Sequence, residues 1–131
     1  MSAKRVNVAI IGAGLMGREV AAAIQRWPAL IDHPVRPRLT AVCDINESAL
    51  DWFDDIDTVT TKVTDYKDLL SDASIDVIYV AVRHDLHERI YSDVIAAGKS
   101  LLAEKPFGID QSAAEAILAA VEKHPESFVR C

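Results

Sequence analysis

Three glycines after an apolar run have the spacing of a nucleotide-binding turn. Gly12, Gly14 and Gly17 stand in the order G-x-G-x-x-G. Gly12 can adopt the positive φ of a sharp turn, Gly14 would let a pyrophosphate approach the backbone, and Gly17 would let a helix pack closely on a strand. The helix predicted to begin at Leu15 and Met16 would direct free N–H groups at an anion. The spacing therefore predicts a dinucleotide site, with an ordinary strand–helix turn as the alternative.

Asp44 follows a second short apolar run. In dinucleotide-binding folds, an acid at this place accepts hydrogen bonds from ribose hydroxyls. Its distance from Gly17 exceeds the usual spacing of about 20 residues, and the proline-rich connection 28–38 accounts for the excess. The carboxylate would repel a 2′-phosphate and Ile45 offers no compensating cation, so NAD is favoured over NADP, although Arg18 could reach a phosphate. A helix cap is the alternative role of Asp44.

A lysine stands between an acid and a proline at the end of another predicted strand, as Glu104-Lys105-Pro106. The ammonium group could donate to a substrate hydroxyl or relay its proton if its surroundings tune its pKa. Pro106 would fix the backbone beside it. A surface charge pair between Glu104 and Lys105 is the alternative.

Two histidines follow the most apolar strand of the chain, which ends at Val82. His84 and His87 are three positions apart but have no suitably spaced third ligand. We therefore expect capping and packing roles, and no metal site.

The elements that must position these residues alternate along the chain. The first helix should turn Val20, Ala23, Ile24 and Trp27 toward the sheet. Strands are expected at 6–11, 39–44, 59–63, 75–82, 99–104 and 127–131, and helices at 15–27, 47–53, 64–70, 84–97 and between Asp110 or Ser112 and Pro125. This order predicts an α/β fold, a doubly wound parallel sheet of the three-layer Rossmann type, with its ligand cleft at the carboxyl ends of the strands.

Composition narrows the classes of protein. The chain has 131 residues, half of them hydrophobic, and a net charge of −6, which fits one dinucleotide-binding domain over 1–131 and argues against nucleic-acid or anionic-membrane binding. It contains no apolar run of about 20 residues and no recognisable signal peptide. Cys43 and Cys131 suggest neither a metal site nor a disulfide framework. We expect a cytoplasmic protein.

Together, the motifs resemble the N-terminal domain of the Gfo/Idh/MocA (glucose–fructose oxidoreductase / inositol dehydrogenase) family. The segments that carry the resemblance are 9–17, 41–44, 80–87 and 104–108. It implies NAD(P)-dependent hydride transfer at a hydroxyl of a sugar, inositol or similar polyol, with Lys105 beside the nicotinamide and substrate and Pro106 shaping that wall. The implied cofactor contacts are Gly12, Gly14, Leu15, Met16, Gly17, Asp44, Ile45, Val82, His84, His87, Glu104, Lys105 and Pro106.

The chain departs from the family in two ways. Arg83 stands where the family usually has proline. Family members also continue for roughly twice this length again, into a C-terminal domain that supplies most of the substrate site, an Asp/His pair and oligomer contacts. We therefore interpret the chain as the N-terminal part of such a dehydrogenase, inactive or nearly so alone, with apolar surface that favours self-association.

Two other functions are compatible with the same glycine turn. A non-catalytic nucleotide-binding or sensor module would need the turn and Asp44 but not Lys105. A methyltransferase that uses S-adenosylmethionine shares the turn and a strand-end acid, but gives no role to Glu104-Lys105-Pro106, so we rank it last.

Overall fold

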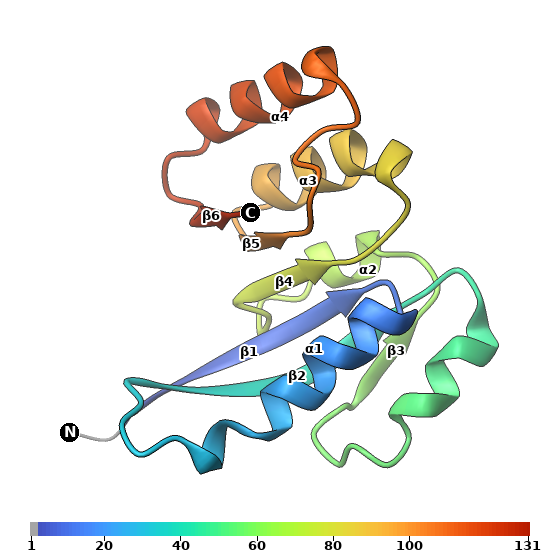
Figure 1. Ribbon diagram of the computed structural model, residues 1–131, viewed down its shortest axis with the longest axis vertical. Helices are drawn as coiled ribbons and strands as arrows, with labels where there is room; N and C mark the ends of the chain where they lie inside the picture. The colour runs from blue at the N-terminus through green and yellow to red at the C-terminus, as the bar shows by residue number, and fades with distance from the viewer. Residues whose placement is uncertain (1–2) are drawn as a thin grey trace.

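Six strands form one parallel sheet in the spatial order β3-β2-β1-β4-β5-β6 (Figure 1). The computed structural model describes residues 3–131. The strands are β1 (Lys4–Ile11), β2 (Val35–Cys43), β3 (Thr61–Val63), β4 (Val77–Val80), β5 (Ser100–Ala103) and β6 (Val129–Arg130). The chain winds outward from β1 in one direction to β3 and then from β4 in the other direction to β6. The predicted α/β fold with a doubly wound parallel sheet is confirmed.

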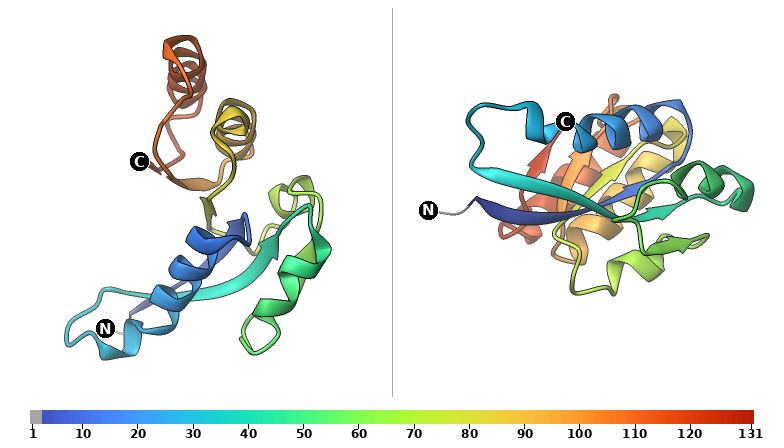
Figure 2. Two further views of the ribbon diagram at one scale, coloured as in Figure 1. Left: turned by 45° about the vertical axis from the view of Figure 1, so that its right-hand side comes forward. Right: turned by 90° about the horizontal axis from the view of Figure 1, so that it is seen from below.

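Helical segments cover both faces of the sheet. They are α1 (Leu15–Gln25), α2 (Lys67–Leu70), α3 (His87–Ala96) and α4 (Gln111–Lys123), with 3₁₀ segments at Trp27–Ala29, Glu47–Phe53 and His84–Leu86. One core cluster joins the sheet to α1 and to Glu47–Phe53, and the other joins it to α2, α3 and α4. α3 and α4 pack side by side (Figures 1 and 2). These layers follow from apolar strands that must be covered on both faces.

The second strand begins earlier than the sequence predicts. Residues 28–38 were expected to be an extended connection, whereas β2 already starts at Val35 and includes Pro37, which lies opposite Val6 of β1. β3 pairs only with Ala41–Cys43, so the first part of β2 keeps one free edge, where a proline is tolerated. The β1–β2 pair therefore extends beyond the rest of the sheet (Figure 1).

The inward face of α1 agrees with the prediction at Val20 and Ile24, which pack against the core, and differs at Ala23. Gly17 and Ala21 are buried and Ile24 is half-buried, whereas Ala23 is exposed. Gly17 sits so close to the end of β1 that the row Gly17–Ala21–Ile24 faces the sheet in place of Ala23. A residue without a Cβ, and not the apolar pattern, sets the rotation of this helix.

Two predicted helix ends agree with the structure. Asp110 caps α4, since its Oδ1 accepts a hydrogen bond from the Ala113 N–H at 2.8 Å. Gly98 follows the end of α3 with a φ of +76°, the left-handed conformation that terminates helices. These two turns carry the chain from α3 into β5 and from β5 into α4.

Candidate active site

Two adjoining cavities lie at the carboxyl ends of the central strands. The larger has a volume of about 600 Å³ and is lined by Ile11, Gly12, Gly14, Cys43, Asp44, Ile45, Thr64, Asp65, Tyr66, Ala81, Val82, Arg83, Leu86, Arg89 and Ile90. The smaller, of about 260 Å³, is lined by Gly14, Leu15, Met16, Ala81, Val82, His84, Glu104 and Lys105. Both include Gly14, Ala81 and Val82, so they form one continuous cleft where the strand order reverses, the place at which open α/β sheets bind ligands.

Each glycine of the turn meets a different steric demand. Gly12 has a φ of +107°, and a Cβ added there would lie 2.1 Å from the carbonyl oxygen of Ala81. A Cβ on Gly17 would lie 1.9 Å from the carbonyl oxygen of Gly12, whereas one on Gly14 would have no heavy atom within 4 Å. Gly12 and Gly17 thus bring β1, β4 and α1 together, and Gly14 leaves open space above the helix N-terminus, which no side chain caps.

Asp44 ties the end of β2 to the glycine turn. Its Oδ2 accepts a hydrogen bond from the Ala13 N–H at 2.8 Å, and its Oδ1 accepts one from the Asn46 N–H at 2.8 Å. The alternative of a helix cap belongs instead to Asn46, whose side chain accepts from the Ser48 N–H. Each Asp44 oxygen can accept a further hydrogen bond, and Asp44 lines the larger cavity, which suits ribose hydroxyls.

Two tyrosine hydroxyls hydrogen-bond to Glu104 and so hold the segment Glu104-Lys105-Pro106 in place. The Tyr79 hydroxyl donates to Glu104 Oε1 at 2.6 Å, and the Tyr91 hydroxyl donates to the Glu104 carbonyl oxygen at 2.7 Å. Burial raises the pKa of both tyrosines, and the bond to Glu104 adds to the rise at Tyr79. The exposed Lys105 ammonium forms no ion pair with the Glu104 carboxylate and stands at the wall of the smaller cavity.

His87 lines neither cavity and has the packing role that the sequence predicts; the cofactor contact that the family resemblance implies for it stays a prediction. Its ring is fully buried and stacks on Tyr91 at 4.6 Å. Nδ1 lies 2.7 Å from the Pro106 carbonyl oxygen and Nε2 lies 3.2 Å from the Val82 carbonyl oxygen. A neutral imidazole carries one N–H and donates to one of these carbonyls, whereas an imidazolium donates to both. His87 therefore joins the loops after β4 and β5 from inside the core.

Gly17 and Pro106 also line neither cavity. Gly17 lies against the Gly12 carbonyl, and Pro106 directly follows Lys105. His84 lines the smaller cavity and Arg83 the larger one. Arg83 pairs with Asp85 through Nε at 3.1 Å and Nη2 at 2.9 Å. Within residues 3–131, no group of three or more histidine, cysteine, aspartate or glutamate side chains is arranged to hold a metal ion.

Several cavity residues were not predicted. Tyr66 and Arg89 line the larger cavity together with Thr64 and Asp65. The Tyr66 hydroxyl donates to Asp93 Oδ2 at 2.6 Å, and burial together with this bond raises its pKa to about 12. The available signal was position, because residues 64–66 follow β3 just as Asp44 follows β2. Arg89 is in the first turn of α3, on the side that faces this cavity.

The fold and the cleft define a class of protein, the Rossmann-type dinucleotide-binding domains. Residues 6–129 match the model of an oxidoreductase family with an NAD-binding Rossmann fold, GFO_IDH_MocA. The chain belongs to this Gfo/Idh/MocA family and is an NAD-binding oxidoreductase domain of it. Among residues 3–131, no helix is both long and apolar enough to cross a membrane.

Three proteins illustrate the similarity. The chain is 30% identical over 121 residues to the uncharacterized oxidoreductase YrbE of Bacillus subtilis, covering 92% of the chain and 33% of YrbE. It is 30% identical over 105 residues to an inositol 2-dehydrogenase/D-chiro-inositol 3-dehydrogenase of Lactiplantibacillus plantarum, covering 79% and 28%. An NAD binding oxidoreductase from Klebsiella pneumoniae superposes with a TM-score of 0.82 at 27% identity, covering 96% and 34%. The chain spans about a third of the length of these proteins.

The contact between Gly17 and Gly12 should dominate the stability of the turn. Gly17→Ala places a methyl group against a backbone oxygen, so we expect the free energy of unfolding to fall by about 2–3 kcal/mol despite the better helix propensity of alanine. Gly14→Ala is the matched control, since its methyl group meets open space, and should cost less than about 1 kcal/mol. Urea unfolding measures both, and equal losses would contradict this assignment.

Cys43 should be chemically inert although it lines the larger cavity. Burial raises the pKa of its thiol to about 12, and the charges of Asp44, Asp65 and Asp68 act in the same direction, so the reactive thiolate is scarce at pH 8. We expect iodoacetamide to modify the exposed Cys131 at least about 100-fold faster. Peptide mass spectrometry measures both rates. The difference should vanish in urea, and similar rates in the folded protein would contradict the prediction.

Proposed function

We propose that this domain binds NAD(H) along the two adjoining cavities, with the adenosine half in the larger one and the nicotinamide half in the smaller one. The observation that carries the proposal is Gly14, which belongs to both cavities and has open space where a Cβ would point. A pyrophosphate over Gly14 would meet the uncapped N-terminus of α1. The residues present therefore fit the cofactor.

Asp44 supports a preference for NAD over NADP. Its carboxylate would accept hydrogen bonds from the 2′- and 3′-hydroxyls of the adenosine ribose, whereas a 2′-phosphate would bring a second negative charge against it. The exposed Ile45 beside it supplies no cation. Arg18 is turned back to its own helix, with Nε 3.4 Å from the Gly14 carbonyl oxygen, and so does not offset that repulsion.

In the whole protein we propose hydride transfer between the nicotinamide and a hydroxyl-bearing carbon of a sugar or inositol-type substrate. When bound, the cofactor supplies the hydride acceptor or donor. Lys105 would hold the substrate hydroxyl and pass on its proton, on a loop that Tyr79 and Tyr91 keep in place through Glu104. The names of the inositol-acting relatives support this substrate class. We further propose that the rest of the substrate site, and any contacts between subunits, come from chain outside these 131 residues.

Two free cysteines and no disulfide among the described residues support a reducing compartment, the cytoplasm.

The alternative function is a non-catalytic nucleotide-binding or sensor module. It would use the glycine turn and Asp44 in the same way, but would leave Lys105 without a role.

Calorimetric titration with NADH and NADPH tests the cofactor site. We expect saturable NADH binding and at least tenfold weaker NADPH binding, because one unfavourable charge contact of about 1.4 kcal/mol changes affinity tenfold. Asp44→Ala should weaken NADH binding by about tenfold and abolish the preference between the cofactors. The ratio of the two affinities is informative because general damage to the turn would weaken both alike.

Asp51→Ala is the matched control, since Asp51 is exposed and lines neither cavity. It should leave both affinities within about twofold. Equal or tighter NADPH binding to the unmodified domain would contradict the role of Asp44, and no binding of either cofactor would contradict the cofactor site itself.

Lys105 separates the dehydrogenase from the sensor module. In a protein that carries this domain and the rest of the substrate site, Lys105→Met should lower kcat by 100-fold or more, the usual contribution of a positioned acid or base. NADH affinity should change less than threefold because the pyrophosphate and ribose contacts remain. The exposed Lys123 at the end of α4 gives the control variant Lys123→Met. An unchanged kcat in Lys105→Met would contradict the catalytic role of Lys105, whereas cofactor binding without any dehydrogenase activity in the unmodified protein would favour the sensor module.

A further inference from the structure

A methionine side chain stands exposed in the wall of the cleft. Met16 is 47% exposed and lines the smaller cavity together with Glu104 and Lys105. It lies in the first turn of α1, and a long side chain at such a position points back toward the N-terminus of its helix. The thioether of Met16 is therefore directed toward the space over Gly14, where the two cavities meet.

The other sulfur atom of the cleft is much less reactive. Cys43 lines the larger cavity, but it is buried and its thiol has a raised pKa of about 12, so little of the reactive thiolate forms. A thioether has no proton to lose, and its oxidation by a peroxide depends on exposure. Among the described residues, Met16 is thus the exposed sulfur of the cleft, since Cys131 lines neither cavity.

The smaller cavity also contains donors that suit an oxidised methionine. A sulfoxide is polar, and its oxygen accepts hydrogen bonds. The first N–H groups of a helix have no acceptor within the helix, and in α1 no side chain caps them. The exposed Lys105 ammonium stands in the wall of the same cavity. The oxygen of an oxidised Met16 would compete with a pyrophosphate for the N–H groups and with a substrate hydroxyl for the ammonium.

We propose that Met16 is a reversible oxidation site that switches off NAD(H) binding, with hydrogen peroxide as the oxidant. The O–O bond of the peroxide breaks, one oxygen atom bonds to the sulfur, which gives up two electrons, and the other leaves as water. A methionine sulfoxide reductase restores the thioether. The proposal rests on the proposed NAD(H) site, because the oxidised side chain acts by excluding that cofactor.

A methionine at this position could instead be only an apolar contact for the cofactor, since methionine packs well against aromatic rings. A contact residue needs to be apolar and of suitable size. A switch requires in addition that oxidation weakens binding and that the bound cofactor shields the sulfur. These two requirements can be measured on this chain without any catalytic activity.

The chain contains two methionines, Met1 and Met16, so peptide mass spectrometry can follow Met16 by itself. After treatment with hydrogen peroxide, catalase removes the oxidant and dithiothreitol reverses the reversible thiol oxidation. We expect conversion of Met16 to the sulfoxide to weaken NADH binding in calorimetry about tenfold, the loss of one good sulfur–aromatic contact. Methionine sulfoxide reductases for both epimers should restore the affinity. Saturating NADH should slow the oxidation of Met16 at least about tenfold, because it covers the sulfur.

Two variants serve as matched controls. Met16→Leu keeps Met1 and both cysteines, so peroxide should leave its own NADH affinity where it was before treatment. Met16→Leu/Leu118→Met moves the methionine to α4, where Leu118 is 51% exposed and lines neither cavity. The methionine at 118 should oxidise within about threefold of the rate of Met16. NADH should not protect it, and its oxidation should not change the NADH affinity of that variant.

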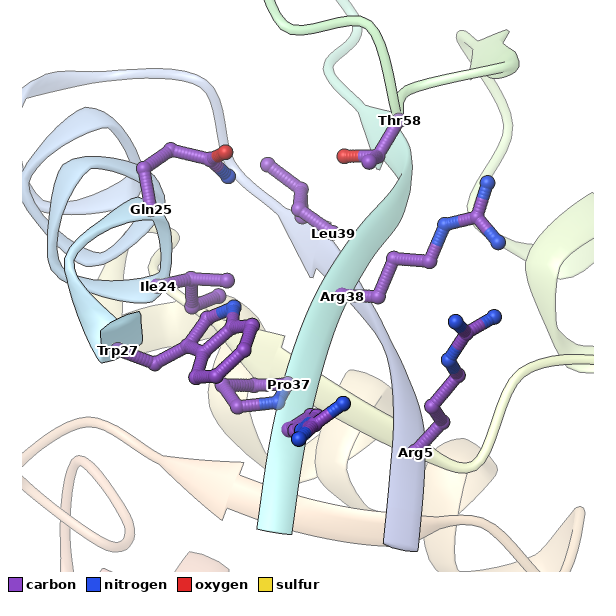
Figure 3. A pocket seen from close by; sticks show the side chains of 9 residues that line it. Arg5, Ile24, Gln25, Trp27, Pro37, Arg38, Leu39 and Thr58 are labelled. Carbon is purple, nitrogen blue, oxygen red and sulfur yellow. The ribbon is translucent and has the colours of Figure 1, made fainter. Parts of the chain in front are cut away.

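Trp27 reports whether peroxide treatment leaves the fold intact. Trp52→Phe, introduced into every variant, leaves it as the only tryptophan. Trp27 lies over Pro37 in a separate pocket at the amino end of the sheet (Figure 3), roughly 16 Å from Met16 along the helix axis. Its emission should be the same before and after oxidation. A change in emission that parallels the loss of NADH binding would assign that loss to unfolding and overturn the proposal.

The failure of the switch can be told apart from the failure of the cofactor site. If the untreated chain does not bind NADH, the cofactor site is contradicted and the switch fails with it. If the untreated chain binds NADH and the fully oxidised chain binds within about twofold as tightly, the switch is wrong and the cofactor site stands. Equal weakening of Met16→Leu by peroxide, or equal protection of the methionine at 118 by NADH, would also overturn the switch alone.

Discussion

The structure depends on how closely the first helix approaches the end of the first strand. Gly17 lies against the Gly12 carbonyl, and Gly12 lies against the Ala81 carbonyl, in contacts that leave no room for a Cβ. These two contacts fix α1, β1 and the loop after β4 relative to one another. The uncapped N-terminus of α1 consequently stands at the junction of the two cavities, and Asp44 reinforces the same turn through the Ala13 N–H.

Much of this arrangement was predictable because parallel strands bring their carboxyl ends to one edge of the sheet. The order of elements and the glycine spacing were sufficient to predict the doubly wound sheet and to bring the glycine turn, Asp44 and Lys105 to one edge of it. Whether these residues hold a cofactor remains a prediction. Residues just beyond a strand are easier to place than residues within a helix, since a strand end has one location and a helix has several faces.

The failures of prediction have specific causes. The packing role expected for His87 is confirmed. The cofactor contact that the family resemblance implies for it stays a prediction, because sequence spacing does not reveal whether a side chain in the first turn of a helix points outward or into the core. Val20 and Ile24 of α1 pack against the core as predicted, whereas Ala23 was assigned to the wrong face because Gly17, which has no side chain, lies against the sheet. The early start of β2 was missed because Pro37 resembles a connection unless one edge of the strand is known to be free.

The buried imidazole of His87 has a mechanical consequence. One ring touches the backbone of Val82 after β4 and of Pro106 after β5, while Tyr91 supports it from below. The same side chain therefore contacts the backbone of both loops that flank the smaller cavity. Because Pro106 directly follows Lys105, the packing of this ring in the core bears on both the width of the cavity and the position of the ammonium group.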